Sequence, residues 1–172
     1  MAESSDTEHP AEDRGSLSAG SRDELAAARL CLLRDARHRL AIQLPLLGNE
    51  LYSSAEELAE LRRIATSGRG AEIRILLHDP ASALRDDHRL IALLQRLPSS
   101  IAVRVPQDEL DLVLTATWLL NDVGGYLYQA DARIAQGRAA RRDRAALAPL
   151  LLQFDARWER AQPATMLQRL GI

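Results

Sequence analysis

Histidine and aspartate gather around one segment of the chain, between residues 78 and 88. Two imidazoles and three carboxylates occur there, a set of donors that zinc or manganese accepts: His78, Asp79, Asp86, Asp87 and His88. The segment follows an apolar strand pattern, and open α/β sheets bind ligands at the carboxyl ends of their strands. The spacing fits no known ligand signature, and Asp86 and Asp87 are also well placed to cap the helix that follows. We therefore weigh a ligand or metal cluster against a capping role and expect no bound metal.

Three further residues with reactive or polar groups lie at a fixed spacing later in the chain. Thr115 and Thr117 belong to an apolar strand pattern, and Asp122 lies in the turn sequence Asn-Asp-Val-Gly-Gly. A threonine hydroxyl does not attack a substrate without an adjacent base, and it carries no positive charge. Threonine is common in strands and aspartate in turns, so an ordinary structural role also accounts for all three side chains.

The residue types exclude several kinds of catalysis. All 22 basic residues are arginine, so no lysine is present to form a Schiff base or to act as a general base. Cys31 is the one cysteine, which excludes an intrachain disulfide. It falls on the apolar side of a predicted helix, with no neighbouring base to activate the thiol. We expect no catalytic residue and no cofactor.

Arginines cluster once, in a polar connector near the last helix: Arg133, Arg138, Arg141, Arg142 and Arg144. Such a cluster is able to bind phosphate groups. The whole chain nevertheless has a net charge of -2, and aromatic residues make up only 3% of it, which leaves no stacking platform for single strands. We interpret the connector as a solvated segment and do not expect nucleic acid as a partner.

The composition predicts one ordinary domain. The 172 residues are 47% hydrophobic, enough for a single core. Residues 1–20 are polar and acidic, which predicts a disordered leader; we expect the folded domain over 21–161 and a tail over 162–172. No segment is typical of a signal peptide or a membrane span, so we expect a cytoplasmic protein without membrane contact.

Hydrophobic periodicity predicts alternating helices and strands. A Ser-x-x-Glu capping box at Ser21 and a similar pattern at Ser53 or Ser54 predict two helix starts. Helical spacing continues to about residue 40, over 58–65, 87–97 and 147–158, and strand patterns cover 40–44, 73–77, 101–105, 113–120 and 126–128. Pro149 either starts or kinks the last helix, whose Phe154 and Trp158 we expect in the core. The order predicts an α/β fold, a mixed β-sheet flanked by helices on both faces.

The strand order and the threonine spacing together resemble one lobe of the phospholipase D-like superfamily, over about residues 24–128. The likeness rests on Arg-Asp-Ala-Arg before the first strand, Ser-Gly-Arg-Gly before the second, and the spacing from Thr115 to Asp122. The family motif reads His-x-Lys-x-x-x-x-Asp. In that family the histidine attacks phosphorus, the lysine binds phosphate oxygens, and two copies of the motif face each other.

The resemblance implies a lobe whose motif is degenerate, because Thr115 stands for the histidine and Thr117 for the lysine while Asp122 remains. It implies a non-catalytic binding or interaction module, with a homodimer or another protein as partner. The alternatives are a residual phosphodiester- or nucleic-acid-handling protein that uses Asp122, His78 or His88, or an accessory domain. The resemblance implies the accessory domain because similar domains accompany acetyltransferases in some bacterial proteins.

Overall fold

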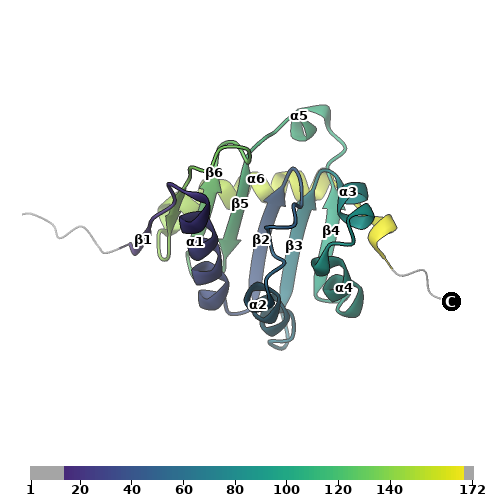
Figure 1. Ribbon diagram of the computed structural model, residues 1–172, viewed down its shortest axis with the longest axis horizontal. Helices are drawn as coiled ribbons and strands as arrows, with labels where there is room; N and C mark the ends of the chain where they lie inside the picture. The colour runs from purple at the N-terminus through teal and green to yellow at the C-terminus, as the bar shows by residue number, and fades with distance from the viewer. Residues whose placement is uncertain (1–13, 169–172) are drawn as a thin grey trace, which may run out of the picture.

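The computed structural model describes residues 14–168, which form one sheet with helices on both faces (Figure 1). Within these residues the sheet has eight strands in the order β1-β7-β6-β5-β2-β3-β4-β8. The strands are β1 (Ser16–Leu17), β2 (Arg39–Leu44), β3 (Glu72–Leu77), β4 (Ile101–Val105), β5 (Thr117–Asn121), β6 (Tyr126–Gln129), β7 (Arg138–Ala140) and β8 (Gln162–Pro163). The helices are α1 (Arg22–Asp35), α2 (Ala55–Ala65), α3 (Pro80–Arg85), α4 (Arg89–Arg96), α5 (Glu109–Leu112), α6 (Arg144–Arg160) and the 3₁₀ helix η1 (Thr165–Leu167).

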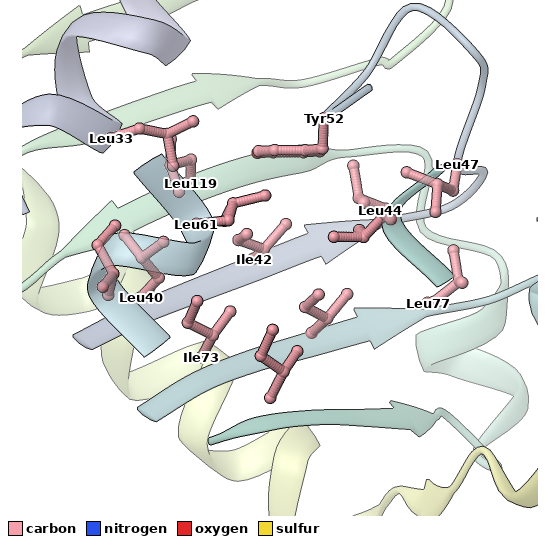
Figure 2. Packing of buried hydrophobic residues seen from close by; sticks show 14 of the residues in the cluster. Leu33, Leu40, Ile42, Leu44, Leu47, Tyr52, Leu61, Ile73, Leu77 and Leu119 are labelled. Atoms are coloured by element: carbon pink, nitrogen blue, oxygen red, sulfur yellow. The ribbon is translucent and has the colours of Figure 1, made fainter. Parts of the chain in front are cut away.

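The first half of the chain builds a parallel sheet. β2 pairs with β3 and β3 with β4, both in parallel, and the helices between them cross over one face. Because side chains alternate along a strand, Leu40, Ile42 and Leu44 point to this face, where they pack with Leu33 and Leu61 of the helices (Figure 2). This is the larger of the two cores.

The second half is antiparallel. β5 inserts beside β2, and β6 and β7 continue outward by hairpin pairing. The alternate side chains of β5, Trp118 and Leu120, point to the other face and pack against Phe154 and Trp158 of α6. The predicted fold class, a mixed sheet with helices on both faces, is therefore confirmed.

Helix α6 begins earlier than Pro149. Asp143 caps it by accepting a hydrogen bond from Ala146 N at 3.0 Å, so the proline lies inside the helix. Phe154 is fully buried and Trp158 is 6% exposed, as predicted. The guanidinium of Arg104 lies 4.5 Å from the centre of the Trp158 ring, a distance at which a cation attracts the ring.

The ordered domain is longer at both ends than the predicted range 21–161. Ser16 and Leu17 pair with Ala140 and Ala139, although the predicted leader covers 1–20; residues 1–13 of that leader lie outside the described residues. At the other end β8 pairs with β4, and Leu167 is buried in the larger core, inside the predicted tail. Two-residue strands carry too little hydrophobic pattern to be predicted from sequence.

The predicted strand 113–120 also begins later in the structure. Residues 109–112 form α5, which Asp108 caps by accepting from Leu110 N at 2.9 Å, and β5 starts only at Thr117. Leu110 is 76% and Val113 is 72% exposed, so their apolar side chains do not belong to a buried strand.

We expect Trp158→Ala to lower the free energy of unfolding by about 3–5 kcal/mol, since a large buried ring leaves a cavity. Leu152→Ala in the same helix is the matched control, because Leu152 is 73% exposed. Chemical denaturation monitored by circular dichroism measures both. Equal unfolding midpoints for the two variants would contradict the packing of α6 described above.

Candidate functional site

The two threonines lie at the edge of the sheet where the parallel strands end. β5 runs antiparallel to β2, so its first residue, Thr117, lies next to the carboxyl end of β2. The Thr117 hydroxyl donates to the Gln43 carbonyl at 2.7 Å, and the Thr115 hydroxyl donates to the Ala130 carbonyl at 3.3 Å. Both hydroxyls therefore serve the backbone of neighbouring strands and loops. We call this edge, with Thr115 and Thr117, the motif edge.

Asp122 lies at the opposite edge of the sheet, beyond the other end of β5. Asp122 directly follows the last residue of β5 and Thr117 is the first residue of that strand, and each strand residue advances about 3.3 Å. One carboxylate oxygen accepts from Arg37 N at 2.9 Å and the other from His38 N at 2.8 Å. Asp122 thereby holds the connection between α1 and β2, and the structure does not bring it together with Thr115 and Thr117.

A polar cluster covers the motif edge on the α6 face. Asp111 of α5 accepts from Arg160 at 2.8 Å and 3.0 Å, and Arg157 Nε lies 3.5 Å from the same carboxylate. Arg157 also donates to Gln43 Oε1 at 3.0 Å, and its guanidinium lies 5.0 Å from the centre of the Trp118 ring. Each of these cations thus has an anionic or polar partner within the protein.

His78 stands directly after β3 at this edge and borders the cluster. Partial burial lowers the pKa of its imidazole; a hydrogen bond to the Leu112 backbone opposes that, and the Arg157 charge lowers the pKa further. Burial also lowers the pKa of Arg157, which Asp111 opposes. The lowered pKa favours the neutral imidazole of His78.

The remaining members of the predicted ligand cluster serve other purposes. His88 is buried, its Nδ1 accepts from Leu90 N at 3.1 Å as the cap of α4, and its Nε2 contacts the Leu51 carbonyl at 2.9 Å. Asp79 caps α3 by accepting from Ser82 N at 3.0 Å. His88 therefore takes the capping role predicted for Asp86 and Asp87. Over residues 14–168, no three histidine, cysteine or acidic side chains converge as a metal site would require.

The arginine connector does not form one patch. Arg133 pairs with Asp131 at 2.6 Å, and this pairing lowers the pKa of Asp131 to about 2. Arg138 lies over the Tyr128 ring, with 5.1 Å between its Cζ and the ring centre. The three other arginines of the connector line a hollow of about 330 Å³ at the Asp122 edge, with these walls: Asp35, Arg37, Asp122, Val123, Arg141, Arg142 and Arg144.

Sequence reasoning missed several residues of these two sites. Gln43 is the one buried polar residue of β2, and it is the one local sign of the motif-edge cluster. Asp111 and Arg160 are 49 positions apart, and Asp35 and Arg141 are 106 apart, so no spacing rule connects them.

The chain belongs to the family described as "Domain of unknown function (DUF7931)", whose model matches residues 21–170. A search of curated proteins finds no match. Among solved structures, the chain is similar to Nuc from Salmonella typhimurium, a phospholipase D family member, with a TM-score of 0.58 and 11% identity over 87% of this chain and 94% of Nuc. The chain therefore has a phospholipase D-like fold, as the resemblance implied.

A second similar structure is TrmBL2, described as an archaeal chromatin protein with a novel mode of DNA binding. The TM-score is 0.61 at 13% identity, over 91% of this chain and 56% of TrmBL2, so this chain spans little more than half of that protein.

Among helices of the described residues, none is long and apolar enough to cross a membrane.

We expect the His78 imidazole to titrate below 6.5 in an NMR pH titration of its ring protons. Arg157→Gln removes a positive charge that lowers this pKa, so the midpoint should rise in that variant. The unfolded chain then binds the proton first, so stability is complete above pH 6.5 and falls as pH decreases from there through the folded midpoint. A wild-type midpoint above 6.5, or one that Arg157→Gln leaves unchanged, would contradict the placement of His78 beside Arg157.

Proposed function

We propose that this chain is a non-catalytic phospholipase D-like domain that acts by binding, as a pseudoenzyme. One observation carries the proposal: the residues at the histidine and lysine positions, Thr115 and Thr117, donate their hydroxyl protons to backbone carbonyls. A hydroxyl used in this way has no adjacent base and supplies no cation for a phosphate.

The space around Thr117 supports the same proposal. A gap of only about 10 Å³ lies beside Thr117, between Arg29, Tyr52 and Gln129, which has room for roughly one water molecule. Arg29 is the one charged side chain in the lining of this gap, and Glu57 neutralises it at 2.5 Å. This gap therefore has no room for a phosphodiester.

The alternative, residual phosphoryl chemistry, has one observation in its favour. The lowered pKa of His78 leaves a neutral imidazole, which is the nucleophilic form, beside the motif edge. The cation next to it is committed, since Arg157 bonds to Gln43 and approaches Asp111. Asp122 is absent from this edge, and His88 is buried with both ring nitrogens engaged by backbone groups.

In this proposal the binding module has a protein as its partner. The resemblance implies that a second copy of the chain is one such partner. Size-exclusion chromatography with light scattering distinguishes a homodimer from a monomer. The DNA binding described for TrmBL2 brings nucleic acid back as a ligand to test, although the net charge of -2 gives no general attraction to it.

We expect no turnover of a chromogenic phosphodiester by the purified protein, with or without added Mn²⁺ or Zn²⁺. His78→Ala is the diagnostic variant, because His78 is the histidine that borders the motif edge. The matched control is His38→Ala, since His38 is exposed and lies before β2 at the opposite edge. Turnover that His78→Ala abolishes and His38→Ala preserves would replace the binding module with the residual enzyme.

A further inference from the structure

The hollow at the Asp122 edge is built by three segments that are distant in sequence. The end of α1 and the connection to β2 supply Asp35 and Arg37, and the turn between β5 and β6 supplies Asp122 and Val123. The segment leading from β7 into α6 supplies three arginines, Arg141, Arg142 and Arg144. The hollow measures about 330 Å³. That volume falls at the lower end of the range in which small-molecule sites lie.

Both carboxylates in the wall already have partners. Asp35 accepts two hydrogen bonds from Arg141, each 2.7 Å long, in the forked geometry that matches a carboxylate to a guanidinium. Asp122 uses both oxygens to accept from the Arg37 and His38 amides. Neither acid therefore neutralises the other cations of the hollow.

Three guanidinium groups remain available. The side chains of Arg37, Arg142 and Arg144 are exposed and have no ion-pair or hydrogen-bond partner within residues 14–168. Four arginines and two aspartates give the wall a formal charge of 4 − 2 = +2, although the whole chain carries -2. The surplus positive charge comes from the side chains of Arg37, Arg142 and Arg144, which line one concave surface and have no partner within residues 14–168.

The backbone beneath these arginines is fixed. Asn121 donates to the Leu32 carbonyl at 3.0 Å and accepts from Gly125 N at 2.7 Å, which ties the β5–β6 turn to α1. Gly124 has φ +94, and a Cβ there would lie 3.0 Å from Arg144 Cγ, so glycine leaves room for the Arg144 stem. Asp122 holds the Arg37 backbone directly. Because the supporting loops are ordered before any ligand arrives, less entropy is lost on binding.

We propose that this hollow binds a phosphate-bearing ligand through Arg37, Arg142 and Arg144. A phosphate group offers three or more acceptor oxygens, so guanidinium groups from several directions can bond to it at once, whereas a carboxylate offers two. Val123 is the one apolar side chain of the wall and no aromatic ring lines it. Recognition therefore rests on the phosphate and not on a stacked base. The proposal goes beyond the binding module above, because the site lies at the edge of the sheet opposite the motif edge.

The ligand's phosphates come from a free diphosphate or from a nucleic-acid backbone, and pyrophosphate and a short DNA duplex of arbitrary sequence are the two probes. Calorimetric titration of the full chain at low ionic strength compares wild type with Arg142→Gln/Arg144→Gln and with Arg37→Gln. These side chains are exposed and have no partner among the described residues, so their loss leaves no buried group unpaired. The matched control is Arg62→Gln/Arg69→Gln, which removes the same charge from two exposed arginines outside the hollow.

We expect the variants of the hollow to bind pyrophosphate at least about tenfold more weakly than wild type, since each loses a charge-assisted hydrogen bond. The control should bind nearly as wild type does. Pyrophosphate binding with this pattern identifies a free diphosphate ligand, and the same pattern with the duplex alone identifies the nucleic-acid backbone. Absence of binding to both probes, or an equal loss in the control, would overturn the proposal. The phosphodiesterase assay above is unaffected by either result.

Discussion

The buried ion pair between Arg29 of α1 and Glu57 of α2 is the contact on which the arrangement of the larger core depends. The two side chains are 7% and 6% exposed, and Nε lies 2.5 Å from Oε1. Removing two charges from water is costly, and a buried pair tolerates it only when its other donors and acceptors are satisfied. Arg29 also donates to the Glu50 carbonyl and lies over the Tyr52 ring, while Glu57 accepts from the Ser53 and Ser54 amides. Helix α1, the loop after β2 and the start of α2 are thus bound together by one charge pair, and its Arg29 also lines the small space beside Thr117.

The segment from Thr115 to Asp122 runs along β5 from one edge of the sheet to the other. The residues at its two ends therefore have different structural roles. Thr115 and Thr117 lie where the parallel strands end, while Asp122 follows the strand at the far edge. The carboxylate binds two backbone amides, a task independent of any reaction at the motif edge. Asp122 therefore has a structural role in the connection before β2. Structural roles account for the spacing from Thr115 to Asp122, and this spacing is not by itself evidence of catalysis.

Much of the fold was predictable because its signals are local. The capping box at Ser54 and Glu57 and the strand patterns over 73–77 and 101–105 each lie within a few residues, and the structure shows them as predicted. The start of β5 was not predictable, because the apolar residues before it resemble a strand pattern, although Leu110 belongs to α5 and is exposed. The sites were harder still. The hollow joins segments more than a hundred positions apart, and whether an arginine is paired or available depends on a partner that the sequence does not place nearby.

A chain whose only cationic side chains are arginines uses many of them as structural donors. Arg63 donates to the carbonyls of Leu33, Arg34 and Ala36 at the end of α1, and Arg104 donates to the Trp158 carbonyl at 2.8 Å. The planar fork of arginine makes such multiple bonds, which a lysine ammonium does less well. An exposed arginine without a partner is ordinary by itself, and several lie scattered over the surface.

Convergence is the informative feature, because like charges repel and a protein gains no stability by collecting them in one concave surface. At the motif edge Arg29 pairs with Glu57, and Arg157 and Arg160 pair with Asp111. At the Asp122 edge the acids are committed to Arg141 and to backbone amides, and three guanidinium groups face one hollow. Among the described residues, the arginine charges near the threonines are therefore neutralised by acids, and the positive charge without an acidic partner lines the hollow at the other end of β5.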